Sequence, residues 1–591
     1  MAETLLSPGV FLNENDLSQI TAGPVAAGAA LLGPTVIGPV NIPTLVTSYS
    51  QYKAIFGAAF VSGGANYEYL TSIAALNYFE QGGQSLLVTR VASGSYTAAT
   101  ASVSGSNGRE SFQLETLSVG SIMNNVNGNL TGTNGSLPSG SSANVRWEVT
   151  GVDTGSGVFS INIRRGDDYN NSKTVLETWT NLSLDPNQNN YIAYVIGDQT
   201  QTVRQDSTGD YYLQTSGSYQ NKSLYVRVAS VSQPTPGYFS QTGVAQTMYT
   251  ASLPLLGSGS ANGAFGGAQG AIYGGYITAT NTTNSPLRMF ENIPTVASST
   301  AANNIQGVVP NDYNIGINLL ENTDAYDFNV VYAPGLTSQN ASSQVSSLLL
   351  LAQGRGDNIA VVDMVGYGQQ INTILNEAVS YDNSYGATYW PWVQIRSRET
   401  GKVNFVPAST LVPAVYEYND RVSAEWFAPA GLNRGSLSTV LQPERKIGVN
   451  DRNLLYQGKV NPIATFPGVG TVIYGQKTLQ QKPSALDRVN VRRLLIALKS
   501  YIGQLGEQIV FEPNTQVTRN KFLSQVNPYL ESVQQRQGLY AFQVVMDESN
   551  NTPDVVDRNQ LVGTIYLQPT KTAEFIQLDF NILPTGATFG Q

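Results

Sequence analysis

The chain contains no histidine and no cysteine among its 591 residues. Ser-His-Asp and Cys-His nucleophiles cannot be built without these side chains, and neither can zinc sites that use them as ligands. A GxxxxGK[ST] phosphate loop is also missing, and the glycine-rich run at 263–275 does not lie between a strand and a helix. We therefore predict that the protein is not an enzyme and uses no metal and no cofactor. Carboxylate pairs, as in a hydrolase, and Ser-Lys chemistry are the remaining catalytic alternatives.

Charged residues are scarce, at 12% of the chain, while aromatic residues reach 9%. This balance argues against a disordered chain, which needs much charge and few aromatics. The net charge of −9 is uneven, because residues 434–591 hold 16 of the 32 basic residues but only 12 of the 41 acidic ones. No basic run is dense enough for a nucleic-acid patch, so we predict no direct contact with nucleic acid.

Long apolar runs are absent as well. No stretch approaches 18 uninterrupted apolar residues, so we predict no membrane insertion. The first twelve residues have neither the basic region nor the apolar region of a signal peptide. Synthesis and assembly in a cytoplasm are therefore expected.

Two separated blocks alternate between strand and helix patterns. In the first block, strands at 26–32 and 85–91 enclose a helix capped by Ser50 and a longer helix at 67–79. In the second, strands at 328–332, 358–364 and 389–395 alternate with helices at 343–353 and 369–380. Pro391 marks the last strand as an edge or a bulge. This alternation predicts one doubly wound, mostly parallel sheet to which both blocks contribute.

Between these blocks, residues 96–285 are rich in Ser, Gly, Asn and Thr and show weak helical periodicity. Short strands are predicted at 145–149, 157–163, 224–228 and 271–279. We interpret the stretch as one or two β-rich modules inserted into the first domain, with exposed loops such as 124–142.

The C-terminal part centres on a helix predicted at 485–505, with Ser484 and Asp487 as a capping box. Asn527-Pro528 is expected to start a second helix, because proline favours the first helical position. Strands follow at 539–545, 561–567 and 574–582, the last with clean alternation. One face of the first helix carries basic residues, namely Arg488, Arg492 and Lys499.

The two ends look like extended arms. Proline and glycine punctuate residues 1–24, and residues 583–591 (LPTGATFGQ) have the same character. The fold class expected is multidomain α/β plus β, with a discontinuous α/β core, β-rich inserted modules and an α+β C-terminal domain. The expected boundaries are an N-terminal arm at 1–24, core at 25–95, insertion at 96–285, core at 286–442, C-terminal domain at 443–582 and C-terminal arm at 583–591.

Several stretches resemble the tail sheath proteins of contractile-tailed bacteriophages and other contractile injection systems. The opening SPGVF is similar to that family's PGVY arm, and YFEQGGQSLLVTRV at 78–91 is similar to its FF-NGG block. The clearest block runs through IGVNDRNLLYQGKVNPIATFPGVGTVIYGQKTL, NVRRLLIALKSYI and VFEPNT, over 447–515. Pro413 departs from the Ala-Gly expected in the family, and residues 96–285 match no block.

The resemblance implies a structural subunit that stacks in hexameric rings around a tail tube and contracts to drive the tube through the host envelope. It implies copies of itself, the tail tube protein, and baseplate and tail terminator proteins as partners, and the virion as location. Arms that add strands to neighbouring subunits are implied at both ends, at Pro8, Gly9, Val10, Phe11, Leu12, Leu583, Pro584 and Phe589. The C-terminal domain faces inward, so Arg488, Arg492 and Lys499 are candidates for the tube contact, with a solvated helix face as the alternative.

Other interpretations stay open at this point. A tailocin or another injection device would have a similar sheath subunit, and an adhesin could bind host glycans through the insertion. Asp547, Asn551, Asp554 and Asp557 lack the glycine and closing glutamate of a calcium loop, which favours a polar hairpin loop. Arg355-Gly356-Asp357 is interpreted as a turn before a strand, and the aromatic side chains of Tyr389, Trp390 and Trp392 as core rather than a sugar platform.

Overall fold

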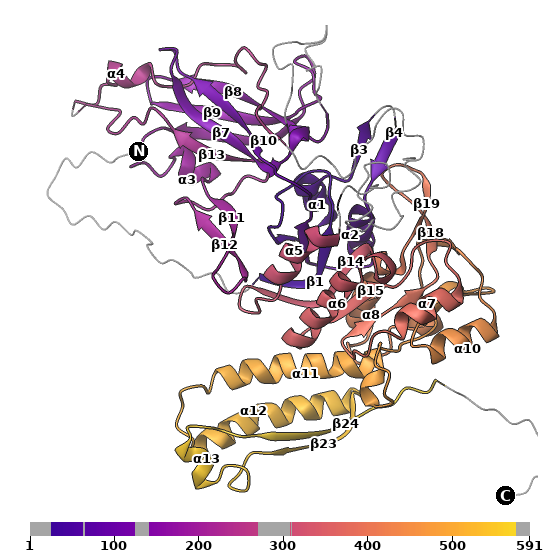
Figure 1. The fold of residues 1–591 in the computed structure, drawn as a ribbon. Helices are drawn as coiled ribbons and strands as arrows, with labels where there is room; N and C mark the ends of the chain where they lie inside the picture. The colour runs from indigo at the N-terminus through magenta and orange to yellow at the C-terminus, as the bar shows by residue number, and fades with distance from the viewer. Residues whose placement is uncertain are drawn as a thin grey trace, which may run out of the picture.

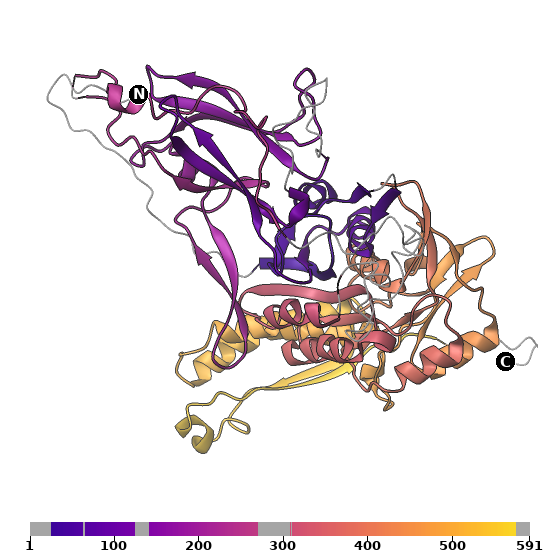
Figure 2. The same ribbon diagram turned by 45° about the horizontal axis from the view of Figure 1, so that its top comes forward.

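The computed structural model describes residues 25–62, 65–123, 141–240, 242–269, 308 and 310–574. Figures 1 and 2 show three bodies joined in a row: a β-rich module, a central α/β core, and a C-terminal body of two long helices and a strand pair. The eight residues predicted as intersubunit arms, the strand predicted at 271–279 and nearly all of the strand at 574–582 lie outside the described residues. Within the described ranges, no helix is both long and apolar enough to cross a membrane.

The core is organised by a six-stranded sheet. Its strands, in spatial order, are β16 (Gly386–Ala387), β15 (Ile359–Asp363), β14 (Tyr326–Thr337), β1 (Val25–Gly33), β5 (Leu86–Arg90) and β2 (Thr44–Val46). All neighbours are parallel except β2 and β5. The prediction of a mostly parallel sheet built from both blocks is confirmed. Strands β5 and β15 are buried throughout, as apolar strands covered on both faces must be.

Helices cover the sheet. They are α1 (Tyr49–Phe56), α2 (Leu70–Glu80), α5 (Tyr313–Leu319), α6 (Ser338–Arg355), α7 (Ile371–Ala378) and α8 (Val412–Val422). Helix α1 is capped by Ser48, whose hydroxyl accepts from the Gln51 amide, and not by Ser50 as expected. Helix α2 starts three residues later than predicted, because Ala65–Glu68 (β4) pairs with Ala59–Ser62 (β3). The Arg355 side chain binds Asp357 and the carbonyl oxygens of Leu320 and Tyr326, which confirms a structural turn there.

The strand predicted at 389–395 is two strands in two different sheets, which corrects the expectation of one edge strand. Before Pro391, β17 (Tyr389–Trp390) pairs with β21 (Asn461–Phe466), which also pairs with β22 (Gly470–Ile473). After it, β18 (Val393–Arg396) lies between β19 (Val403–Val406) and β20 (Val440–Pro443). Proline has no amide hydrogen to donate to a ladder, so the chain changes sheets at this point. The aromatic side chains at 389, 390 and 392 are buried, so the core interpretation is confirmed. Two helices, α9 (Gly431–Arg434) and α10 (Val449–Gln457), complete this region.

The β module (residues 98–269) packs two three-stranded antiparallel sheets around its own apolar cluster. One sheet contains β6 (Ala98–Ser104), β7 (Glu110–Val119) and β13 (Val226–Val231), and the other contains β8 (Val145–Asp153), β9 (Val158–Arg165) and β10 (Val175–Ser183). Phe112 and Phe159 stack between the sheets with ring centroids 5.5 Å apart. Two short helices are α3 (Ile192–Ile196) and α4 (Thr247–Thr250). A hairpin of β11 (Thr200–Gln205) and β12 (Tyr211–Ser216) reaches back to α5, where the Tyr211 amide donates to Asn318 Oδ1 at 2.7 Å.

The C-terminal body consists of α11 (Val489–Glu507), α12 (Gln516–Gln535), α13 (Pro553–Asp557) and the antiparallel pair β23 (Leu539–Val545) and β24 (Thr564–Pro569). Helix α12 lies between α11 and the strand pair (Figure 1). Two predicted helix starts are wrong. Ser484 caps a separate 3₁₀ turn at Ala485–Asp487, and α11 begins after it. Helix α12 starts after Thr515, whose hydroxyl accepts from the Thr518 amide, and Pro528 lies inside it. Burial of Phe522, Val526, Leu530 and Val533 outweighs the hydrogen bond that proline removes.

Candidate assembly surfaces

Arg488, the first predicted tube-facing residue, is engaged within the chain. Its Nε and Nη2 donate to the two carboxylate oxygens of Glu574 at 2.7 and 2.9 Å, and Nη1 lies 2.7 Å from Asp487 Oδ1. Burial works against the charged form of Glu574, but hydrogen bonds from Arg488, Tyr456 and Gln476 hold the pKa of its carboxyl below the ordinary value. Arg488 therefore fixes the end of the described chain beside α10 and α11.

Arg492 and Lys499 both meet the ring of Tyr385, which belongs to the core. The Arg492 guanidinium is 3.9 Å from the ring centroid, donates to the Ser384 hydroxyl, and only 4% of the residue is exposed. Burial lowers the pKa of Arg492. The Lys499 ammonium donates to the Tyr385 hydroxyl at 3.2 Å, and Lys499 itself is exposed. The three basic residues thus do not form the shared open face expected from sequence, and of the three only Lys499 is exposed.

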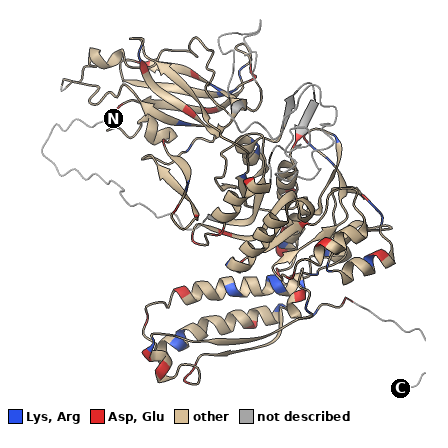
Figure 3. Ribbon diagram, viewed as in Figure 1, with Lys and Arg blue, Asp and Glu red and all other residues tan. Residues whose placement is uncertain are grey.

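A fourth basic residue, Arg493, escaped sequence reasoning and joins the C-terminal body to the core. Its guanidinium binds both carboxylate oxygens of Asp420 on α8, with Nη1 2.8 Å from Oδ1, and stacks 4.7 Å from the Tyr416 ring. Burial by itself lowers the pKa of Arg493, but the charge and hydrogen bonds of Asp420 outweigh this effect. The pKa of Arg493 is therefore above its ordinary value. The available signal was the Arg492-Arg493 pair inside an apolar helix, because buried arginines need partners. Figure 3 shows these basic residues of α11 in blue next to the core.

Helix α11 also links the two bodies through apolar contacts. Val489 and Ile496 belong to the apolar cluster of the core, whereas Leu494, Leu498 and Leu505 belong to that of the C-terminal body. A single helix with two apolar faces therefore connects the bodies, and Arg488, Arg492 and Arg493 reinforce the connection.

The strand pair β23–β24 leaves one side of each strand without a ladder partner among the described residues. Tyr540 and Tyr566 are exposed on it, at 60% and 59%. Free strand edges beside large side chains are templates for added strands. The loop between these strands is closed by Asn551, which binds the Asp547 carbonyl and both the amide and carbonyl groups of Val562. No metal-ligand cluster occurs in the described part of the chain.

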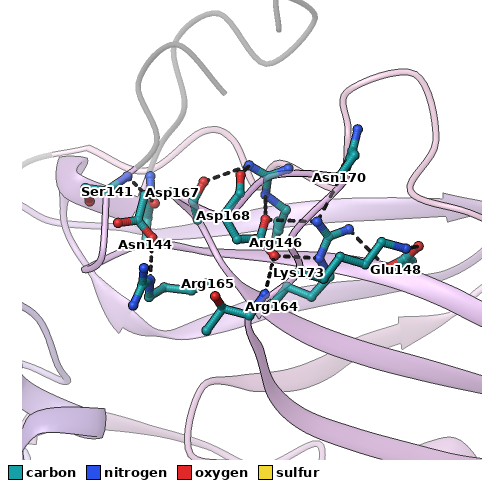
Figure 4. A network of polar contacts seen from close by, with 12 residues as sticks. Ser141, Asn144, Arg146, Glu148, Arg164, Arg165, Asp167, Asp168, Asn170 and Lys173 are labelled. Atoms are coloured by element: carbon teal, nitrogen blue, oxygen red, sulfur yellow. Dashed lines mark hydrogen bonds and ion pairs between the residues drawn. The ribbon is translucent and has the colours of Figure 1, made fainter. Parts of the chain in front are cut away.

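A buried ionic network fastens one loop of the β module (Figure 4). Arg164 donates to both oxygens of Asp168 at 2.8 and 2.9 Å and to Glu148 at 3.0 Å. Arg146 Nε lies 3.2 Å from Asp168, and its Nη2 donates to the carbonyl oxygens of Gly166 and Asp168. Arg146, Arg164 and Asp168 are all buried. Because water cannot solvate their charges, the carboxylate and the two guanidinium groups neutralise one another.

Comparison with known proteins gives a consistent picture. Residues 272–479 match the phage tail sheath protein central domain, and residues 481–582 match the phage tail sheath C-terminal domain. The tail sheath protein of Vibrio phage KVP40 is 37% identical over 227 residues, which are 38% of this chain and 33% of that protein. The tail sheath protein of Enterobacteria phage T4 is 38% identical over 187 residues, 32% of this chain and 28% of that protein. The matches thus span about a third of the length of these curated relatives.

The crystal structure of a sheath tail protein from Listeria innocua has a similar fold. It superposes with a TM-score of 0.52, covers 93% of this chain and 96% of its own, and shares 10% identity. At that identity the likeness concerns the fold.

Proposed function

This chain belongs to the phage tail sheath family, a family of structural proteins, and from that premise we propose that it polymerises as stacked hexameric rings around a tail tube. The sheath then contracts and drives the tube through the host envelope. The partners are other copies of the chain, the tail tube protein, and the baseplate and tail terminator proteins of the tail. The subunit assembles in the bacterial cytoplasm and becomes part of the virion.

The observation that carries this proposal is the strand pair β23–β24, whose outer edges have no ladder partner in the described part of the chain. A neighbour's terminal segment at 1–24 or 583–591 adds a strand at such an edge. Each backbone hydrogen bond contributes about 0.5–1.5 kcal/mol net, so a strand of roughly six residues contributes several kcal/mol. Added strands tether subunits without fixing the angle between their bodies. This allows the rings to rearrange while the sheath stays continuous.

The joint between the core and the C-terminal body supports motion of each subunit as one piece. The shared helix α11 and the Arg493–Asp420 pair tie the two bodies together. Contraction then changes contacts between subunits rather than within them. At the tube, we propose that Lys499 makes an electrostatic contact with an acidic surface, which salt weakens.

The test is electron microscopy of the full chain, expressed alone, at low and high salt. Regular tubes or stacked rings are expected. Variants that lack residues 1–18 or 583–591 are expected to stay monomeric, and their circular dichroism spectra should match that of the full chain. A full chain that remains monomeric, or forms isolated trimers, under every condition contradicts the proposal and favours an adhesin.

A further inference from the structure

A pocket of 570 Å³ opens on the core between α2 and the strand β18, next to the residues that precede β20. Ile73, Leu76 and Ile395 form its apolar wall, and Arg396 and Arg398 are exposed at its rim. Ile73 and Ile395 belong to the apolar cluster of the core. The wall is therefore fixed by packing, and the pocket does not depend on a ligand for its shape.

Asn77 also lines this pocket, but its amide nitrogen is not accessible from it. The residue is 4% exposed, and its Nδ2 is buried and has no acceptor among the described residues. Neighbouring groups are engaged: Gln81 Nε2 donates to the Ser438 hydroxyl at 3.1 Å, and the Ser397 hydroxyl donates to Glu68. The groups that the pocket offers to a ligand are therefore its apolar wall and its exposed rim arginines. The pocket is thus suited to a ligand that brings a carboxylate oxygen together with an apolar group.

An aromatic side chain of the kind that the pocket would accept lies on the C-terminal body, in the loop 508–514 that joins α11 to α12. Phe511 is fully exposed there, with a φ of +69°, a region that bulky residues rarely adopt. The loop is anchored on both sides of the ring, because Ile509 is buried and Asn514 Nδ2 donates to the Gln560 carbonyl at 2.8 Å. A fixed loop therefore presents a bare aromatic side chain to the outside.

The charges around the loop and around the pocket are complementary. Glu507 and Glu512 flank Phe511 and are exposed, and the sequence has no basic residue between Lys499 and Arg519. At the pocket, Arg396 and Arg398 are exposed. Among the residues that the structure describes, Arg398 is paired with the carboxylate of Glu80, whereas Arg396 donates to the Gly401 carbonyl and has no carboxylate partner.

We propose that the Phe511 loop of one copy docks into the α2–β18 pocket of a second copy. The phenyl ring packs against the apolar wall, and Glu512 meets the rim arginines. Figure 1 shows the segment between α11 and α12 on the opposite side of the molecule from α2 and β18, so one chain cannot make this contact with itself. Each copy has one loop and one pocket, and such a heterologous contact propagates along a ring or a helical stack. The inference rests on the proposed assembly of identical copies.

The absence of cysteine makes a cross-linking test unambiguous. The variant with both Glu512→Cys and Ser438→Cys is assembled under reducing conditions, checked for tubes by microscopy, and then oxidised. A ladder of covalent multimers that reductant reverses is expected, whereas each single variant gives at most dimers. Tubes without a ladder would overturn the docking and leave the sheath function intact. Failure of the wild-type chain to assemble overturns the sheath function and this contact with it.

A second measurement covers the case in which the cysteine pair itself blocks assembly. Phe511→Ala is compared with Val517→Ala, a matched control at an apolar residue that is 78% exposed on the same body. We expect Phe511→Ala to raise the critical concentration for assembly about tenfold or more, because burial of one phenyl ring is lost, and Val517→Ala to change it less than about twofold. Equal effects of the two variants contradict the proposal.

Discussion

The β module and the C-terminal body both bury arginine side chains, but they use them differently. In the β module, Arg146 and Arg164 bind Asp168, and all three belong to the same sheet and the loop that follows it. In the C-terminal body, Arg493 binds Asp420 of the core. The first arrangement closes a unit on itself, and the second ties one unit to the next.

The apolar clusters differ in the same way. The cluster of the β module consists of its own residues apart from Val36, Ile37 and Tyr69. The cluster of the C-terminal body takes Ala424 and Trp426 from the segment after α8, and α11 contributes to two clusters. We infer that the β module unfolds as a separate unit, whereas the C-terminal body depends on the core.

The largest effect is expected for Asp168→Asn, which leaves the buried Arg146 guanidinium without a carboxylate and Arg164 with that of Glu148 alone. Removing one partner of a buried pair costs about 3–5 kcal/mol. We expect limited proteolysis to cut within residues 98–269 while tubes still form under the microscope. Asp153→Asn, at the exposed end of β8 in the same module, is the control. If Asp168→Asn unfolds the whole chain in a single transition, the module is not a separate unit.

Asp420→Asn is expected to cost somewhat less, about 3 kcal/mol, because 18% of the Asp420 side chain is exposed while Arg493 stays buried. For this variant, the pattern of proteolysis and assembly should be the reverse of that expected for Asp168→Asn. Proteolysis should release the C-terminal body and assembly should fail, while the β module remains resistant. Continued tube formation at the wild-type concentration is the outcome that contradicts a joint that bears load.

A pH dependence is expected from the core. Burial, followed by the nearby charge of Asp420, raises the pKa of Glu417 to about 7. Burial also raises the pKa of Glu444 to about 7 and that of Asp363 to about 6. A carboxyl whose pKa is higher in the folded state binds its proton more tightly there, so stability is greatest below the unfolded pKa and falls as pH rises to about 7.

We expect this decline to be about 1–3 kcal/mol between pH 4.5 and 7, with a level profile above. Chemical denaturation followed by tryptophan fluorescence at several pH values measures it. Glu417→Gln should flatten part of the slope, because the amide does not titrate. A steeper slope in that variant than in the wild type would mean that Glu417 is charged in the fold.

The smallest effect on stability is expected for Lys499→Glu, within about 0.5 kcal/mol, because this side chain is exposed. Its effect should appear only in binding to tubes of the tail tube protein, as a weaker affinity with less dependence on salt. Lys521→Glu, on α12 and also exposed, is the matched control. Equal affinities of the two variants would favour the solvated-face interpretation of Lys499.

The sequence by itself determined the parts that depend on neighbours along the chain. The alternation of strand and helix patterns predicted the mostly parallel sheet. Strands such as Ile359–Asp363 are buried on both faces and therefore consist mainly of apolar residues. The missing histidine and cysteine excluded whole classes of site, and the order of the similar blocks indicated the family.

Tertiary structure alone decided where charges and helix ends lie. Ser484 favours a helix N-cap and Pro528 favours the first position of a helix. Packing of the long helices nevertheless decided that α11 begins after the Ser484 turn and that α12 continues through Pro528. Three arginines lie close together at the start of α11, namely Arg488, Arg492 and Arg493. Nothing in the neighbouring sequence predicts their partners, which are Glu574, Tyr385 and Asp420. Those partners lie 73 to 107 residues away, and burial is decided by which distant surfaces meet, because a charge enters the interior only where its partner is already placed.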